Sequence, residues 1–268
     1  MTKAPYFTDE SMVRIVHREQ IVALSGARAL LMQAAHPVAF EGFFAQTGSL
    51  REPYERLART ARVMNLISFG PRDAADRATR RVRAMHRRVR GELARPAGRF
   101  PAGTPYAADD PVLLLWILAC LADSGLTVYE RYVRGLSPHE RDRYWQDYRV
   151  IGRLFGLQPG QMPSTHADFR RYMDEMIDGE DLLVTRAARE LGLRIVMRPP
   201  VPLAARPLLE LANFVTVGLL PRRIRRAYRL GWDPARELAL RGGAEYAKRV
   251  LVPLLPDRLR LVASARAA

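Results

Sequence analysis

Cysteine is almost absent from this sequence, because Cys120 is the only one and it lies within an apolar run. One cysteine excludes an intrachain disulfide and any metal site built from several cysteines, and it suits a reducing compartment. Long apolar stretches are also missing: the longest uninterrupted one, 112–122, is well short of the ~20 residues that a membrane span needs. The N-terminal residues show no apolar core of signal-peptide length. We therefore expect a cytoplasmic protein, for which peripheral contact with a membrane surface stays open.

Lysine is scarce too, since Lys3 and Lys248 are the only two, so the formal charge of +15 comes almost entirely from arginine. A basic balance of this size permits binding to nucleic acid or to an anionic membrane. The sequence has, however, no zinc-ligand spacing, no helix-turn-helix pattern and no signature of an RNA-binding sheet. Charge without such a module is weak support, so we expect no specific nucleic-acid partner.

Several catalytic motifs are missing as well. There is no G-x-S-x-G nucleophile elbow, no P-loop, no G-x-G-x-x-G and no H-E-x-x-H. These absences make an α/β-hydrolase, nucleotide chemistry or a metalloprotease of the zincin type poor interpretations of the chain.

Period-two alternation bounded by turn residues is not found anywhere, so no strand is expected. Helical periodicity predicts instead an all-α, single globular bundle of about ten helices without internal repeats, one domain over 1–268 with its core at about 26–228. Segment 94–108 is expected to be a Pro/Gly-rich loop. The expected helices cover 8–35 with a break near Gly26, 38–45, 53–69, 71–93, 111–133, 138–155, 165–177, 185–196, 207–219, 221–229 and 233–251, the last followed by C-terminal residues to 262.

Capping residues mark several of these helix starts. Thr8 and Thr185 are expected N-caps, and Asp110 precedes a proline at the first helical position. Ser137 with Glu140, and Thr165 with Asp168, have the spacing of capping boxes. The helix from 111 is hydrophobic nearly all round over 113–118, which predicts a place at the centre of the bundle.

Two neighbouring helices, 53–69 and 71–93, carry the candidate chemistry. Arg56, Arg59 and Thr60 share one face of the first, since they lie at i, i+3 and i+4. They could bind a carboxylate in the bidentate way that guanidinium allows, or they could belong to a solvated face with Glu52, Glu55 and Arg62. The residues alone leave both interpretations open.

The second of these helices presents one imidazole, His86, flanked at helical spacing by Val82 and Val89. His86 could be a metal ligand facing polar groups of the first helix, which is the outline of a haem pocket. It could equally make an ordinary interhelical hydrogen bond.

Weaker candidates lie nearer the N-terminus. His36 precedes Pro37 at a helix end, where it could contact a metal or serve as a C-terminal cap. Glu41 could act as a catalytic base or be a plain surface carboxylate. His17, His139 and His166 are interpreted as structural.

The chain resembles the family of rubber oxygenases (latex-clearing proteins) and MpaB-type haem oxygenases, formerly a domain of unknown function. The resemblance runs from about 26 to 228. It rests on A-H-P at 35–37, R-x-x-R-T at 56–60, F-G at 69–70, M-H-x-x-V-x-G at 85–91, Y-x-A-x-D-P at 106–111, L-L-L-W at 113–116, D-S at 123–124, Y-E-R at 129–131 and G-L-L-P-x-x-x-R at 218–225.

The resemblance implies a globin-like helical core that holds non-covalent haem b, with His86 as the proximal iron ligand. It also implies that the arginine-threonine motif, with Arg56, Arg59 and Thr60, lines the pocket. Met64, Val82, Val89 and His36 are further candidates for contact with the cofactor. Two departures from the family pattern matter. Arginine at 59 replaces a lysine that can reach the distal iron position in rubber oxygenases, and Leu118 stands where many relatives have histidine. Distal chemistry and substrate therefore cannot be copied from the rubber enzymes.

Together these features predict a haem-dependent oxidoreductase that uses dioxygen, or peroxide, against an unidentified small apolar substrate. Arg59, Thr60 and Glu41 are the candidate catalytic residues. The alternatives are a non-catalytic haem carrier or a gas or redox sensor with the same His86 pocket, and a basic helical protein that binds nucleic acid or membrane without haem.

Overall fold

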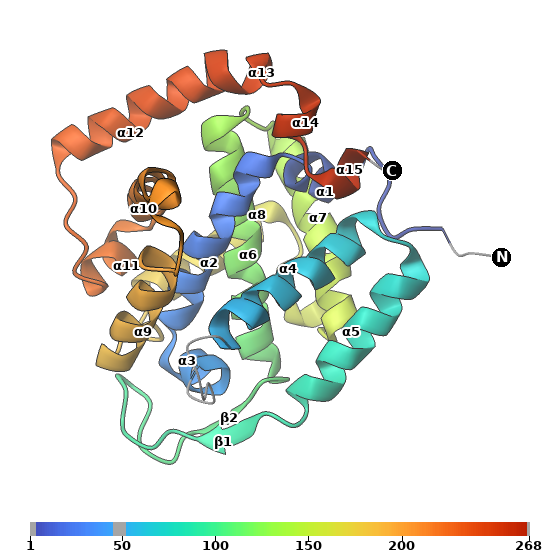
Figure 1. Ribbon diagram of the computed structural model, residues 1–268. Coiled ribbons are helices and arrows are strands. Elements are labelled where there is room, and N and C mark those ends of the chain that lie inside the picture. The colour runs from blue at the N-terminus through green and yellow to red at the C-terminus, as the bar shows by residue number, and fades with distance from the viewer. Residues whose placement is uncertain (1–3, 45–51, 267–268) are drawn as a thin grey trace.

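The computed structural model describes residues 4–44 and 52–266, and their secondary structure is almost entirely helical (Figure 1). The predicted all-α class is confirmed. The described residues contain more helical segments than the expected ten or so, because several are one turn long. A globin-like arrangement of the core stays a prediction. The longer helices are α2 (Ser25–Ala34), α3 (Pro37–Phe44), α4 (Glu52–Phe69), α5 (Arg72–His86), α6 (Pro111–Tyr132), α7 (Pro138–Phe155), α8 (His166–Asp178), α9 (Arg186–Met197), α10 (Arg206–Leu219) and α12 (Pro234–Tyr246).

Helix α6 runs through the middle of the molecule, as its composition predicts (Figure 1). Trp116, Ala119 and Cys120 have no exposed surface, and α2 packs along α6 more extensively than any other element does. Of the described helices, α6 alone is long and apolar enough to cross a membrane, but 72% of its most apolar window is buried inside the protein. Burial of most of the helix explains its apolar composition without a membrane.

The expected caps at the starts of α6, α7, α8 and α9 are all present. Asp110 accepts hydrogen bonds from the backbone N–H groups of Val112 and Leu113 at 2.8 and 3.2 Å. Ser137 and Thr165 form capping boxes with Glu140 and Asp168, and Thr185 accepts from the N–H of Ala188. These bonds satisfy N–H groups that have no partner inside the helix, which fixes where each helix begins.

The expected helix over 8–35 is wrong in its continuity. The structure divides it into α1 (Met12–His17), a 3-10 turn at Gln20–Leu24 and α2, so Thr8 precedes the helix and Gly26 lies inside α2. The break falls at Glu19, whose backbone bridges Leu261 and whose buried carboxylate accepts two 2.8 Å hydrogen bonds from Arg260. Partners more than 200 residues away thus interrupt the helix, and local periodicity cannot reveal them.

The helix expected over 71–93 is too long, and part of segment 94–108 is not a loop. Helix α5 ends at His86, and the chain then forms a small antiparallel sheet of β1 (Arg90–Glu92) and β2 (Pro105–Ala107). Gly91 pairs with Tyr106 in this sheet. Strands of three residues are too short for a period of two to show in the sequence.

A buried ionic cluster joins three helices near the centre. The Asp123 carboxylate on α6 lies 2.8 Å from the Arg28 guanidinium on α2 and 2.5 Å from that of Arg170 on α8. Arg28 also donates to the Ser124 hydroxyl and to the Leu219 carbonyl, at 2.7 and 2.8 Å. Because the Arg28 and Asp123 side chains are only 5% and 6% exposed, each charge depends on the other for its solvation.

The C-terminal helices form an outer layer along one edge of the molecule (Figure 1). Helix α12 continues through a π-helical turn at Ala247–Leu251 into α13 (Val252–Leu254), which agrees with the helix expected over 233–251. A second hydrophobic cluster joins this layer to α6 and consists of Val128, Tyr132, Val215, Leu219, Leu240 and Ala244.

Candidate functional site

Helices α4 and α5 meet in a tight turn at Gly70 and Pro71 and diverge from it towards α3 and β1 (Figure 1). The Gly70 N–H donates to the Leu66 carbonyl at 2.9 Å, and a Cβ at residue 70 would lie 2.7 Å from that same oxygen. Glycine is therefore needed here for space. Pro71 has extended backbone angles at the N-cap of α5, which ends one helix and starts the next.

His86 is the last residue of α5 and belongs to the face of that helix that packs inwards. Ala75, Thr79, Val82 and His86 follow one another at i, i+4, i+7 and i+11, which keeps them on one face. Ala75 and Thr79 are 0% and 3% exposed, whereas Val82 and His86 are half-buried. The inward face of α5 is thus closed near the turn and accessible at its far end, where the imidazole lies.

The inward face of α4 shows the same change along its length. Ile67, close to the turn, is 1% exposed, and Leu57 and Met64 pack partly against the core. Thr60 lies on this face, three residues after Leu57 and four before Met64, yet it is exposed. The side of α4 that faces the protein body is therefore accessible at Thr60. That position is about as far from the turn along α4 as Val82 is along α5.

The other two residues predicted on α4 are Arg59 and Arg56. Arg59 is exposed and lies on the flank of the helix, one residue from the inward face. Arg56 lies in α4 by its backbone, and its side chain is outside the described part of the structure.

Val89 does not flank His86 on a helix, which corrects the expectation. It follows α5, is half-buried and donates its N–H to the His86 carbonyl at 3.0 Å. Its own carbonyl accepts from the N–H of Ala108, the residue after β2. The C-terminal end of α5 is thus tied to the small sheet through Val89.

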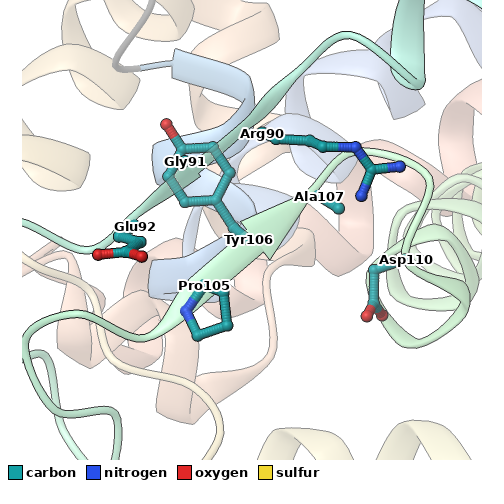
Figure 2. Close-up of a pocket in the computed structure, with 7 residues that line it drawn as sticks. All are labelled: Arg90, Gly91, Glu92, Pro105, Tyr106, Ala107 and Asp110. Carbon is teal, nitrogen blue, oxygen red and sulfur yellow. The ribbon is translucent and has the colours of Figure 1, made fainter.

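Tyr106 of β2 lies beside this end of α5 in a position that sequence reasoning missed. Its ring extends across β1 with the hydroxyl next to Gly91, and the same ring lies against Gly42 of α3 (Figure 2). A Cβ at Gly42 would be 3.3 Å from Tyr106 Cδ2. The sequence signal for this contact was Gly91, the glycine that ends the M-H-x-x-V-x-G motif. A glycine inside a strand often marks a place where another group comes close to the backbone.

A pocket of about 450 Å³ surrounds Tyr106 on the outer side of the small sheet (Figure 2). Arg90 lies four residues after His86, and its Nη2 donates to both carboxylate oxygens of Asp109 at 3.1 and 3.0 Å, so the guanidinium has a counter-charge beside it. The lining residues are Arg90, Gly91, Glu92, Pro105, Tyr106, Ala107 and Asp110. The pocket therefore combines one phenol with three charged side chains and a largely apolar remainder.

His36 is buried at the start of α3. It caps the N-terminus of that helix and not, as expected, the C-terminus of the preceding one. Its carbonyl accepts from the N–H of Phe40 at 2.8 Å, and its Nδ1 accepts from the N–H of Ala39 at 3.3 Å. The ring lies 5.4 Å from that of Phe100, and burial lowers the pKa of His36 to about 4. An Nδ1 that accepts a hydrogen bond fixes the proton of the neutral ring on Nε2.

Glu41 is half-buried in α3, next to Gly42 and hence near Tyr106. Burial raises the pKa of its carboxyl group. A carboxyl group in such a place holds a proton more readily than a surface carboxylate does.

His17, interpreted as structural from the sequence, forms a polar cluster away from the hairpin. Its Nε2 lies 3.0 Å from the hydroxyl oxygens of both Tyr144 and Tyr148, and burial lowers its pKa to about 4. A Cβ at Gly125 of α6 would lie 2.5 Å from the Tyr144 hydroxyl, so α6 closes the cluster. These contacts account for His17 as a packing residue between α1, α6 and α7.

Taken together, the described residues define an all-α protein in which a diverging helix pair carries one half-buried imidazole at the end of α5 and one exposed hydroxyl midway along the inward face of α4. The family model described as the catalytic domain of ER-bound oxygenase mpaB/B' and rubber oxygenase matches residues 13–249. The chain belongs to this oxygenase family, as its motifs predict.

Two curated proteins are also similar to this chain. Each is an uncharacterized protein, one from Mycobacterium bovis and one from Mycobacterium tuberculosis, and each is 28% identical over 195 residues. The alignment covers 70% of this chain and 70% of either relative. No solved structure matches the chain significantly.

Proposed function

We propose that this protein is a haem b-dependent oxygenase that uses dioxygen against a small apolar organic substrate. The observation that supports it most is the position of His86, an imidazole at the half-buried end of an inward face that is fully buried nearer the turn. Membership of an oxygenase family supports the reaction class. The choice of haem as cofactor rests on the donor set of the hairpin.

The donors on the hairpin suit a haem better than a bare metal ion. Among residues 4–44 and 52–266, no three His, Cys, Asp or Glu side chains gather closely enough to hold a metal ion. A porphyrin brings its own in-plane ligands, so a single imidazole such as His86 suffices. Val82 and Met64 would offer apolar contact to a flat ring, and Arg56 could pair with a propionate.

In this proposal the haem supplies the activation of dioxygen, and the chain's own residues bind and orient the reactants. His86 would hold the iron. The Thr60 hydroxyl, on the inward face of α4, would donate a hydrogen bond to the oxidant, and Arg59 would add a charged donor from the flank. Glu41, whose carboxyl pKa is raised by burial, would hold or accept a proton near the substrate.

Apolar residues near the start of α6 would take the substrate. Leu114, Ile117 and Leu121 are partly exposed and follow one another at i, i+3 and i+7, on one face of a helix that is otherwise buried. A face of this kind binds apolar molecules by excluding water, but it has no polar groups that would select one of them. The proposal therefore stays with the substrate class.

The first test is the absorption spectrum of protein expressed with haem. We expect a Soret band that corresponds to about one haem per chain, and we expect His86→Ala to lose most of it. His139→Ala is the matched control, since His139 is exposed on α7. Loss of haem in the control, or retention of haem and spectrum in His86→Ala, would contradict the assignment. Oxygen consumption with a reductant then separates an oxygenase from a haem carrier or sensor.

A further inference from the structure

Exposed large apolar side chains concentrate on the C-terminal helices. Nine of the twelve among the described residues belong to 203–259, whereas the other three, Met85, Val112 and Leu183, are scattered through the rest of the chain. Four of the nine are more than 70% exposed. The nine are Leu203, Leu208, Leu211, Leu238, Tyr246, Leu251, Leu254, Leu255 and Leu259. Single exposed leucines need no explanation, but a concentration of them does.

Helix α12 is apolar on two opposite sides. Leu240 and Ala244 are buried against α10 and α6 in the second hydrophobic cluster. Leu238 and Tyr246, eight residues apart on the other side, are 73% and 57% exposed. Gly242 lies midway between them, and no atom lies within 4 Å of a Cβ built there. The outer side of α12 therefore faces open solvent along the edge of the molecule (Figure 1).

The C-terminal part of the chain carries more than half of the net positive charge. Residues 198–266 contain 14 Arg and Lys against five Asp and Glu, a net charge of +9 out of +15 for the whole sequence. Arg222, Arg223, Arg226 and Arg229 are exposed, and no acidic residue occurs between 211 and 232 to neutralise them. The outer layer thus combines accessible leucines with uncompensated guanidinium groups.

We propose that this layer, residues 203–259, docks on the surface of an anionic lipid bilayer. Leucine side chains can enter the boundary between headgroups and acyl chains while guanidinium groups bind lipid phosphates, and the two contributions add. Arginine suits this position because its stem is apolar and only its tip needs water or phosphate.

A protein partner and a nucleic acid fit the layer less well. Protein interfaces are centred on a compact, aromatic-rich core, whereas these side chains are spread over six helical segments with Tyr246 as their single aromatic residue. A nucleic acid would pair with the arginines but would leave the leucines in water. The inference is independent of the haem proposal, because it uses none of the residues near His86.

Flotation of the full-length protein with lipid vesicles tests the inference. We expect the protein to float with vesicles of phosphatidylcholine mixed with phosphatidylglycerol and not with phosphatidylcholine alone, and to be released by salt at ~1 M. Leu238→Gln with Leu254→Gln, and separately Arg222→Gln with Arg226→Gln, should each weaken binding about tenfold or more.

Matched controls remove similar groups elsewhere. Val112→Gln with Leu183→Gln replaces two exposed apolar side chains, and Arg95→Gln with Arg171→Gln replaces two exposed arginines; both should bind like the wild type. Equal effects of the test and control pairs would overturn the proposal. So would a dimer in sedimentation that the leucine pair dissociates, or duplex DNA binding that the arginine pair abolishes and the leucine pair leaves unchanged.

Discussion

The phenol of Tyr106 occupies the space that a side chain at residue 91 would need. A Cβ on Gly91 would lie 2.5 Å from Tyr106 Oη and 2.6 Å from its Cζ. The backbone of Gly91 is not in the left-handed region, so the glycine is required by the ring and not by its φ angle. The two residues also pair within the small sheet, whose first strand begins four residues after α5 ends at His86.

Gly91→Ala should therefore destabilise the protein by about 1–3 kcal/mol, as over-packing commonly does. Urea unfolding measures it. Adding Tyr106→Ala should recover part of the loss, because the ring would no longer occupy the site. Gly135→Ala is the control, since nothing lies within 4 Å of a Cβ there. If Gly91→Ala and Gly135→Ala lowered the free energy of unfolding equally, the contact between Gly91 and Tyr106 would not contribute to stability.

Asp123→Ala should cost roughly 3–5 kcal/mol in the free energy of unfolding, because it leaves the buried guanidinium of Arg28 without its counter-charge. Asp174→Ala is a close control. It removes the other carboxylate that contacts Arg170, but Asp174 is 63% exposed, so its change should stay within about 0.5 kcal/mol. Similar losses in the two variants would mean that burial does not set the strength of this cluster.

Stability should fall as the pH drops from about 6.5 to about 4, and His36 should account for part of the fall. Burial lowers the pKa of this histidine to about 4 in the folded protein, so the unfolded chain binds a proton first as the pH decreases. The stabilisation is complete above the unfolded pKa and is lost on the way down to the folded one. It corresponds to about 3 kcal/mol at most.

The variant His36→Asn isolates this contribution, since asparagine also accepts a hydrogen bond at a helix start but does not titrate. Its free energy of unfolding should vary less steeply between pH 6.5 and 4 than that of the wild type. Parallel pH profiles for the two proteins would contradict the assignment.

If the haem proposal holds, the ferric protein should be mainly high-spin. Arg59 stays protonated and offers no lone pair, and Thr60 is a poor ligand as a neutral hydroxyl. His36 is 3% exposed, and its Nδ1 already accepts the Ala39 N–H, so it is poorly placed to become a second ligand. Electron paramagnetic resonance measures the spin state. A dominant low-spin signal that disappears in His36→Ala would refute the open distal site.

Arg59→Ala should slow oxygen-dependent turnover by on the order of 10²-fold and leave haem content unchanged, as expected for a lost donor that stabilises developing charge. Arg62→Ala is the matched variant, because Arg62 is also exposed on α4 and its substitution removes the same charge. Haem content from the absorption spectrum separates an effect on oxygen chemistry from one on cofactor retention. Equal turnover in the two variants would contradict a role of Arg59 in oxygen chemistry and support its interpretation as part of a solvated face.

Local signals in the sequence determined much of this protein. The apolar composition of 113–118 predicted the central helix α6, and Asp110, Ser137, Thr165 and Thr185 marked helix starts that the structure confirms. The motifs around residues 56–60 and 85–91 predicted the family. These predictions succeed because capping and periodicity depend on residues within about one turn of each other.

Only the tertiary structure decided where α5 ends, what His36 does and how the charges are paired. Tyr106 meets Gly91 from a separate strand, Arg260 reaches Glu19 across most of the chain, and Asp123 joins Arg28 to Arg170. Each depends on two segments that are distant in the sequence and are brought together by packing, so no window of neighbouring residues contains the information. The accessible end of the α4–α5 hairpin has the same origin, because periodicity places Thr60 and His86 on inward faces and only the packing of the other helices leaves those faces open there.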